Sequence, residues 1–420
     1  MVAAAFVGLL FLGLPIALVL AIAAIVYIHS SGNDVLLLSY GQQLFSGIES
    51  YGLLAIPLFM LVGEVMHEGG ITRRLMDAAK AFVGSVRGGL LYVNLLANMM
   101  MASILGSAAA QIAIMTQVMV PEMEKSGYRR DLAAATTAAA GLLSPIIPPS
   151  MLFVIYGVLA QISIGDMFIA GIVPGLMMAA GFVIVIALLG LRHPYPRGER
   201  LSWADRGRFL VSGLPAGLVP VVIVGSILTG IATPTESAAV AVLVAWAVGQ
   251  FLYREFRAAR WGDVLYRAAM NSAIILFLIA CAQVFGWVII FEQVPQLVAR
   301  WIQSVAEGPV AFMLLVNVLL LLLGCVIDAL AALIIVVPIL LPIATGVYGI
   351  DQFQFGVVVC INLVLGLLTP PVGSGLFISA SLTGLKPGEI FAAVWPFILS
   401  TAVVVVLLSI EPWFVTVLIR

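Results

Sequence analysis

The sequence predicts an all-α polytopic membrane protein built as an inverted repeat, with two re-entrant helical hairpins and two discontinuous helices. Three observations support this fold class. Of 420 residues, 63% are hydrophobic and only 9% are charged, whereas soluble domains carry about 25% charged residues. A Pro-rich motif occurs twice inside long apolar segments, and the basic residues are confined to a few loops. Together they exclude a soluble protein and favour a membrane transporter.

The repeated motif is the most informative feature. GLLSPIIPPSMLF begins at Gly141, and GLLTPPVGSGLF begins 225 positions later at Gly366, with Ser144 and Thr369 in register. Proline removes an amide donor and ends a regular helix, so each copy interrupts its apolar segment. Such a break is tolerated in a bilayer only where it is buried in protein or lines a polar cavity. Matched breaks in two halves of a chain indicate the midplane site of a secondary transporter.

A spanning helix needs about 20 apolar residues. The segments that satisfy this requirement are 2–28, 51–67, 131–162, 167–191, 209–231, 236–252, 268–291, 354–382 and 388–417. Two further apolar regions, 88–121 and 309–346, are too long for one crossing and are interrupted near their middles by small or polar residues. We therefore expect both to be re-entrant hairpins that enter and leave by the same face.

The basic residues give the orientation. Four loops hold 16 of the 19 Lys and Arg, namely Arg73, Arg74, Lys80, Arg87, Lys125, Arg129, Arg130, Arg192, Arg197, Arg200, Arg206, Arg208, Arg254, Arg257, Arg260 and Arg267. Cytoplasmic loops accumulate basic residues. The connections without any are 161–166, 232–235, 291–295 and 347–353, and we expect them outside. The crossings then alternate consistently if the two long regions are hairpins.

These assignments give two repeats of opposite orientation, 1–208 and 232–420, joined by a connecting helix at 209–231. Each repeat is expected to contain scaffold helices, an amphipathic arm, a hairpin, a broken helix and a final helix. In the first repeat these elements lie at 2–67, 70–84, 88–121, 131–162 and 167–191. In the second they lie at 236–291, 295–307, 309–346, 354–382 and 388–417.

The hairpin tips carry candidate ligands. Ser103 and Ser107 lie in the first tip; their small side chains either supply oxygen ligands or simply permit close helix packing. Asp328 in the second tip is the only formal charge between Glu307 and Asp351. An ionisable residue at membrane depth is costly and is usually functional. Asp328 could ligate a cation, take up a proton or cap the returning helix, because Asp is a strong N-cap.

The breaks supply further ligands. Carbonyls at the end of an interrupted helix lose their amide partners, and with one hydroxyl group they suit a small hard cation. Half-helix N-termini favour an anionic substrate. A plain proline kink is the alternative at either break. An intramembrane hydrolase using Ser374 or Asp328 is a rival from another class, but all three histidines lie outside the apolar cores, so no general base is evident and we expect no enzyme.

The chain resembles a known family in three motifs that occur in order: PIIPPS at 145–150, GIATPTESAAVAV at 230–242 and GLLTPPVG at 366–373. These are similar to the large membrane subunit of tripartite ATP-independent periplasmic (TRAP) transporters. The resemblance implies a multi-pass protein of the bacterial or archaeal cytoplasmic (inner) membrane that takes up an organic acid with Na⁺ by an elevator mechanism. It also implies two partners, a periplasmic substrate-binding protein and a small four-helix membrane subunit.

The resemblance also implies site residues by position. One Na⁺ site would use Ser103, Ser144, Ile147 and Pro149. A second would use Asp328, Gly366, Thr369 and Val372, and several of these residues would act through backbone carbonyls. The substrate would contact Ser107, Ser150, Gly373 and Ser374. Ser144 departs from the family pattern, in which this position is often Gly. A stand-alone cation-coupled carboxylate carrier or antiporter without partners remains the alternative function, as does proton coupling through Asp328.

Overall fold

The structure is a computed structural model that describes residues 6, 8–10, 12–32, 35–83, 87–192, 195–196 and 202–419. The described residues form helices joined by short connections. The helices are α2 Ile16–Ser30, α3 Leu36–Ser46, α4 Ala55–Glu68, α5 Ile71–Val83, α6 Gly89–Leu105, α7 Ala108–Lys125, α8 Arg130–Gly141, α9 Met151–Ala160, α10 Ile164–Arg192, α11 Trp203–Leu228, α12 Pro234–Ala247, α13 Trp261–Phe291, α14 Val294–Gln303, α15 Pro309–Gly324, α16 Ala329–Gly346, α17 Gln352–Gly366, α18 Ser374–Thr383, α19 Pro387–Ile410 and α20 Trp413–Thr416. Short turns of 3₁₀ helix lie at Tyr51–Leu54 and Ala258–Arg260, and a π-helical turn lies at Val248–Leu252.

Within the described ranges, 7 helices are long and apolar enough to cross a membrane. They are Tyr51–Glu68, Ile164–Leu191, Ala204–Leu228, Pro234–Leu252, Trp261–Phe291, Ala329–Gly346 and Pro387–Ile410. The prediction of an all-helical, multi-span membrane protein is therefore confirmed.

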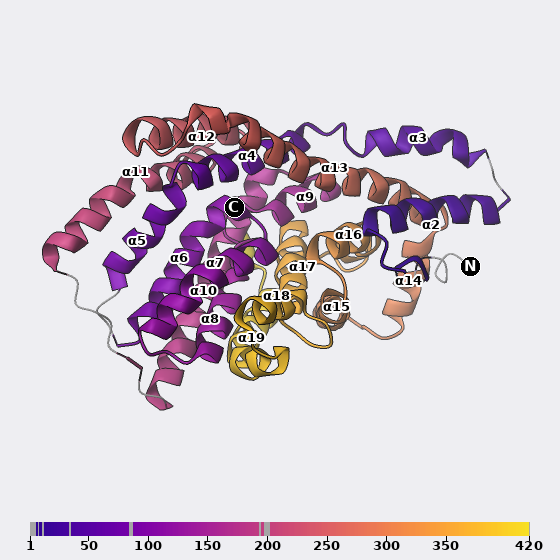
Figure 1. Ribbon diagram of the computed structural model, residues 1–420. Helices are drawn as coiled ribbons and strands as arrows, with labels where there is room; N and C mark the ends of the chain where they lie inside the picture. Colours follow the sequence, from indigo (N-terminus) through magenta and orange to yellow (C-terminus); the bar gives the residue numbers. More distant parts are fainter. Residues whose placement is uncertain are drawn as a thin grey trace.

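The helices form two groups that lie side by side. We call α2, α3, α4, α12 and α13 the scaffold layer; it runs along the upper edge of Figure 1, where α13 packs against α2, α3 and α4, and α4 packs against α12. Beneath it lie α6, α7 and α8 from the first half and α15 to α19 from the second half. Contacts between α13 and α16, and from α4 to α6 and α9, join the two groups.

Both predicted hairpins are pairs of helices joined by a tight turn. The first consists of α6 and α7, and its tip is Gly106–Ser107; the second consists of α15 and α16, and its tip spans 325–328. Gly106 has a positive φ of 58°, a conformation that glycine adopts without the steric cost of a Cβ atom. This turn lets α7 start immediately after α6 ends.

Both Pro-rich motifs interrupt a helix. The first helix stops at Gly141 and resumes at Met151; the second stops at Gly366 and resumes at Ser374. Each break contains a cis peptide bond, at Pro148–Pro149 and at Pro370–Pro371. The chain is thus non-helical at the two places where the sequence predicts discontinuous helices.

Glycines bring each hairpin against its break. A Cβ atom on Gly366 would lie 2.4 Å from the carbonyl carbon of Gly324, at the end of α15. A Cβ atom on Gly141, the matching residue of the first motif, would lie 2.5 Å from Cγ1 of Ile112 in α7. At Gly366 the neighbour is backbone, so only glycine permits this packing; at Gly141 the Ile112 side chain would have to move. The repeated glycine of the motif therefore sets the contact between hairpin and broken helix.

Several expected boundaries were wrong. The helix expected at 2–28 is interrupted: Phe6 and residues 8–10 are helical, and α2 then begins at Ile16, directly after Pro15, because the positive φ of Gly13 (73°) turns the chain just before it; residues 2–5 lie outside the described ranges. A further helix, α3, follows it. The sequence did not predict α3, because Ser39 and neighbouring polar residues interrupt its apolar residues. The helix expected at 388–417 ends at Ile410, where Pro412 prevents its continuation.

Two more helices begin earlier than expected. The helix expected at 268–291 begins at Trp261, and the connecting helix expected at 209–231 spans Trp203–Leu228. Ser202 caps the latter, because its hydroxyl accepts a hydrogen bond from the Asp205 amide at 3.0 Å. The first turns of both helices contain charged side chains, which a helix end accommodates by extending them into water. Hydropathy alone therefore places these starts too late.

The arm expected at 70–84 is α5, and it is anchored beside the scaffold layer. The Arg74 guanidinium lies 3.9 Å from the ring centroid of Tyr253 and pairs with Glu255 at 2.8 Å. The Tyr253 hydroxyl donates to the Ser212 carbonyl at 2.6 Å, and burial raises the pKa of Tyr253. This contact fixes α5 relative to α11 and to the loop after α12. The arm expected at 295–307 contains α14.

Candidate functional site

The two hairpin tips place an oxygen-bearing residue at the start of each returning helix. Ser107 is the N-cap of α7, and its Oγ accepts a hydrogen bond from the Ala110 amide at 3.5 Å. Asp328 is the N-cap of α16, and its Oδ1 accepts from the Leu330 amide at 3.0 Å. The capping role considered for Asp328 is therefore confirmed. The residue remains exposed, so capping does not prevent its carboxylate from contacting a ligand.

Both tips open on one cavity of about 620 Å³, which we call the tip cavity. The hairpins contribute Gly106, Ser107, Ala108, Asp328 and Ala329; the breaks contribute Pro145 and Leu367; the start of α9 contributes Met151; the scaffold contributes Glu64, His67, Glu68, Arg267 and Asn271. Polar groups of both hairpins thus face polar groups of the scaffold across a space large enough for a small organic molecule.

The first break is buried and contains an oxygen without a partner. The Ser144 side chain has 0% exposure, and its Oγ has no hydrogen-bond partner among the described residues. Ile147 is half-buried and Pro149 is buried. An unpaired buried hydroxyl costs about 1–3 kcal/mol, a cost that a ligand at this oxygen would remove. Ser103 lies in α6 two residues before that helix ends, but its side chain is outside the described part of the chain.

The second break is fixed by the second hairpin. The Gly373 amide donates to the Cys325 carbonyl at 2.9 Å, and Gly373 has a positive φ of 57°. Thr369 Oγ1 donates to the Leu365 carbonyl at 3.0 Å, which leaves its oxygen lone pairs available. Val372 has 42% exposure. Hairpin and break therefore share a backbone hydrogen bond, and movement of one changes the geometry of the other.

The four residues expected to contact the substrate do not all lie at the tip cavity. Only Ser107 lines the tip cavity among the four, as far as the described residues show. Ser150 is buried and already engaged: its Oγ donates to the Pro145 carbonyl and accepts from the Phe153 amide at 3.2 Å. Gly373 is buried and Ser374 is half-buried, both beside the second break. The tips, the scaffold, the first break and the start of α9, with Met151 and Leu152, form the walls of this cavity.

The donor set of the two breaks fits a small hard cation. Ser144 and Thr369 offer hydroxyl oxygens, Asp328 offers a carboxylate, and the non-helical segments offer carbonyl oxygens. Hard cations prefer oxygen ligands, and unwound carbonyls at interrupted helices hold Na⁺ in transporters. The described residues contain no group of three or more His, Cys, Asp or Glu that could hold a metal ion. Oxygen donors of this kind suit a hard cation rather than a soft transition metal.

Buried amides tie each hairpin to its broken helix. The Asn362 amide of α17 donates to the Asn317 carbonyl and to Asn317 Oδ1, both at 3.0 Å. In the first half, Asn94 donates to Thr137 Oγ1 of α8 at 2.7 Å, and Asn98 donates to Asn94 Oδ1 at 2.9 Å. All of these side chains have relative exposures of 9% or less. Each hairpin and its break therefore form one unit.

Sequence reasoning missed these amides, although a signal was present. Asn98 and Asn317 occupy matching places, each seven residues before the end of its hairpin arm at Leu105 and Gly324. Thr137 and Asn362 are separated by 225 positions, the spacing of the repeated motif. Polar residues at matched positions of apolar helices point to a shared contact, because an unpaired polar group is costly there.

The scaffold wall of the tip cavity carries an ion-pair cluster that was also missed. Arg267 of α13 donates from Nε to Glu64 Oε2 at 2.7 Å and from Nη2 to Glu68 Oε2 at 3.4 Å. Glu68 also pairs with Arg260 at 3.5 Å. The sequence places Arg267 in a loop, and only the early start of α13 brings it beside α4. Arg267 is the only lysine or arginine among the described residues that line the cavity.

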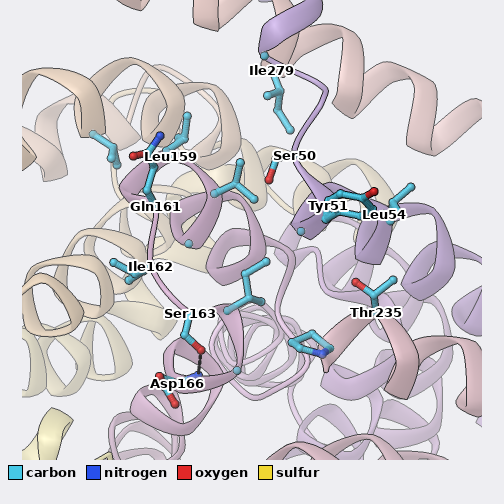
Figure 2. Close-up of a pocket in the computed structure, with 18 of the residues that line it drawn as sticks. Ser50, Tyr51, Leu54, Leu159, Gln161, Ile162, Ser163, Asp166, Thr235 and Ile279 are labelled. Carbon is cyan, nitrogen blue, oxygen red and sulfur yellow. Dashed lines mark hydrogen bonds between the residues drawn. The ribbon is translucent and has the colours of Figure 1, made fainter. Parts of the chain in front are cut away.

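A second cavity, of about 1250 Å³, lies at the opposite end of the scaffold, and we call it the loop cavity. Figure 2 shows the 159–166 segment, with Gln161, Ser163 and Asp166, opposite Ser50, Tyr51 and Thr235. Along α13, Arg267 to Ile275 line the tip cavity, whereas Ile279 to Ile290 line the loop cavity. The two spaces therefore occupy successive stretches of one scaffold helix.

The overall arrangement matches solved transporters. The structure superposes on the YdaH transporter of Alcanivorax borkumensis with a TM-score of 0.67 at 14% identity, covering 96% of this chain and 97% of that one. It superposes on MtrF of Neisseria gonorrhoeae with a TM-score of 0.60 at 11% identity, covering 91% and 85%. A scaffold layer with paired hairpins and interrupted helices thus defines a multi-span helical protein with the fold of these two structures.

The sequence comparisons identify the family. Residues 3–414 match the family described as "Tripartite ATP-independent periplasmic transporter, DctM component". The chain is 34% identical to the sialic acid TRAP transporter large permease protein SiaM of Vibrio cholerae over 98% of this chain and 96% of that protein. It is 37% identical to the 2,3-diketo-L-gulonate TRAP transporter large permease protein YiaN of Escherichia coli over 92% and 91%. The chain therefore belongs to the TRAP transporters as their DctM component, the large permease subunit, and is not an enzyme.

A third relative is longer. The isethionate TRAP transporter permease protein DctMQ of Oleidesulfovibrio alaskensis is 36% identical over 96% of this chain but only 63% of its own length. The family resemblance seen in the three motifs is confirmed, and the hydrolase alternative is excluded.

Proposed function

We propose that this chain is the membrane permease subunit for Na⁺-coupled uptake of an organic acid that a periplasmic substrate-binding protein delivers, by an elevator mechanism. One observation supports this most strongly: each broken helix packs against a helical hairpin, and both hairpin tips open on one cavity beside a separate scaffold layer. In this proposal the hairpins are re-entrant, and with the breaks they form the mobile domain.

Sodium would bind at the two breaks, through Ser144, Ile147 and Pro149 in the first and Gly366, Thr369, Val372 and Asp328 in the second, with Ser103 from the first tip. Because the Gly373 amide is bonded to the Cys325 carbonyl of the second tip, ordering the break also orders the tip. The substrate carboxylate would then meet Ser107. Inward movement of one positive charge across 100 mV supplies about 2.3 kcal/mol.

In this proposal the conformation is the inward-facing state. The tip cavity lies beside Glu64, His67 and Arg267, at the ends of α4 and α13 that join the Arg-rich loops. Cytoplasmic loops are enriched in basic residues, so this end faces the cytoplasm. An outward-facing state would bring the tips from Asn271 towards Gln283 of α13, a shift of about 18 Å at ~1.5 Å per helical residue.

Partners and substrate class follow from the family. The longer relative DctMQ supports association of this chain with a small membrane subunit. The names of the relatives cite sialic acid, 2,3-diketo-L-gulonate and isethionate, all small organic anions. We infer a small organic anion as the substrate, a carboxylate like sialic acid and 2,3-diketo-L-gulonate, and a place in the bacterial inner membrane.

The test is reconstitution in proteoliposomes with the small subunit and candidate binding proteins, over a panel of organic acids that includes those three anions and succinate. We expect uptake that requires both an inward Na⁺ gradient and a binding protein. Uptake driven by a pH gradient without Na⁺ would instead support proton coupling through Asp328. Uptake without any binding protein would support the alternative, a stand-alone carrier or antiporter.

A further inference from the structure

In the described part of the chain, Arg267 is the only lysine or arginine that the scaffold wall of the tip cavity presents to an incoming anion. Arg267, Asn271 and Ile275 are spaced by four residues and therefore share one face of α13, the face that lines the cavity. Glu64 and Glu68 share the facing side of α4 in the same way. The charged groups that meet there come from two scaffold helices, whereas Asp328 comes from the opposite wall.

The Arg267 guanidinium is only partly committed to these carboxylates. Its Nε and Nη2 donate to Glu64 and Glu68, whereas Nη1 has no partner in the described part of the chain. The Arg267 side chain keeps 39% exposure, about twice the 20% of Glu64. Arginine has five N–H donors in a planar fork that matches a carboxylate. A second carboxylate can therefore approach the guanidinium from the cavity.

If Arg267 turned towards a ligand, Glu68 would keep an ion-pair partner and Glu64 would not, within the part of the chain that the structure describes. Glu68 keeps an ion pair with Arg260 at 3.5 Å. Glu64 has Arg267 as its only ion-pair partner among the described residues. Glu64 is thus the anion that a bound carboxylate would displace, and its return to Arg267 would expel that carboxylate.

We propose that Arg267 is a substrate-binding residue of the scaffold, which holds the carboxylate of the organic acid in the inward-facing state, and that Glu64 competes for it and promotes release. The inference rests on the proposed transport function and adds a scaffold contact to it. An anion that leaves the hairpin tips at Ser107 then meets Arg267 before it reaches the cytoplasm.

Two substitutions with opposite expected effects test this. Arg267→Gln removes the cation, so anion affinity should fall by at least about tenfold, the equivalent of one charge-assisted hydrogen bond. Glu64→Gln removes the competitor, so affinity should rise by roughly threefold or more and efflux should slow. If the Arg267–Glu64 ion pair only joined α4 to α13, either substitution would break it. The anion affinity of both variants would then shift in the same direction.

The control is Glu255→Gln, which breaks the ion pair with Arg74 at 2.8 Å outside the cavity and should leave binding unchanged. Binding is measured by calorimetry on the complex with the small subunit, in Na⁺, with succinate, N-acetylneuraminate and isethionate as probes and neutral succinamide as a blank. Thermal unfolding of each unliganded variant reports folding.

Opposite shifts in the anion affinity of the two variants support the inference, and shifts in the same direction overturn it. Absence of saturable binding of any probe to the unmodified protein also overturns it. The proposed function fails separately, if Na⁺-dependent, binding-protein-dependent uptake is absent from the reconstituted system.

Discussion

Replacing Gly366 by alanine inserts a methyl group between the second broken helix and its hairpin. The new Cβ atom would lie 2.4 Å from the carbonyl carbon, 2.6 Å from Cα and 2.8 Å from the oxygen of Gly324. These are backbone atoms, which cannot rotate away. Reaching ordinary contact near 3.4 Å requires α15 and α17 to separate by 1.0 Å, the difference between 3.4 and 2.4 Å. Such overpacking costs about 1–3 kcal/mol.

The functional effect should exceed the loss of stability, because the displaced end of α15 leads directly into the second tip. Ligand groups need placement within about 0.5 Å to bind well. We expect the Na⁺ concentration for half-maximal uptake to rise by at least about tenfold, together with a lower unfolding temperature. The assays are Na⁺ titration of uptake in proteoliposomes and thermal unfolding of the purified protein.

Two further glycines provide matched controls. Gly225→Ala in α11 meets no atom within 4 Å, so it should be neutral or gain about 0.5–1 kcal/mol from helix propensity. Gly141→Ala meets the Cγ1 atom of the Ile112 side chain at 2.5 Å. Because this side chain can rotate, the changes in unfolding temperature and in half-maximal Na⁺ concentration should be smaller than for Gly366→Ala. If Gly366→Ala behaves like Gly225→Ala in both assays, the contact between hairpin and break does not control Na⁺ binding.

Substitutions at three other positions give distinct outcomes. Ser144→Ala removes a buried, unpaired oxygen, so the protein without Na⁺ should be equally or more stable, while stabilisation by added Na⁺ in thermal unfolding should shrink; an unchanged Na⁺ response would exclude this oxygen as a ligand. Asp328→Asn keeps an N-cap and should retain stability but lose Na⁺-dependent uptake, whereas Asp328→Ala should lose both; equal uptake by Asp328→Asn and the unmodified protein would contradict a charge at the ion site. Asn362→Leu removes two hydrogen bonds to Asn317 and should cost about 1–3 kcal/mol of unfolding free energy, as measured by denaturant unfolding; no loss would mean that the amides do not join the hairpin to its break.

Much of the fold could be predicted because the bilayer limits the choices. Long apolar segments must be helical, since lipid offers no hydrogen-bond partners for the backbone, and prolines mark where those helices stop. The starts of α11 and α13 were misplaced because charged side chains at helix ends extend into water. Helix α3 was missed because its sequence lacks a continuous apolar run.

The sequence predicted the ligand residues of the candidate site but not the residues that line its cavity. Matched motifs identified Ser144 and Thr369, and the isolated charge identified Asp328. The sequence could not show that Ser150 is occupied as a cap, because Oγ of a serine before a helix can also face a ligand. Nor could it reveal Arg267, since its pairing with Glu64 joins positions 203 residues apart. Contacts between distant helices depend on packing, which no local pattern encodes.

The central claim is that the two interrupted helices hold sodium and thereby order the hairpin tips. A high-resolution density map of the complex with the small subunit, recorded once in Na⁺ and once in choline, tests it most directly. We predict a density feature surrounded by oxygens at each break in Na⁺ only, with better-ordered tips. Identical maps in the two salts, with no ion at either break, would contradict the account.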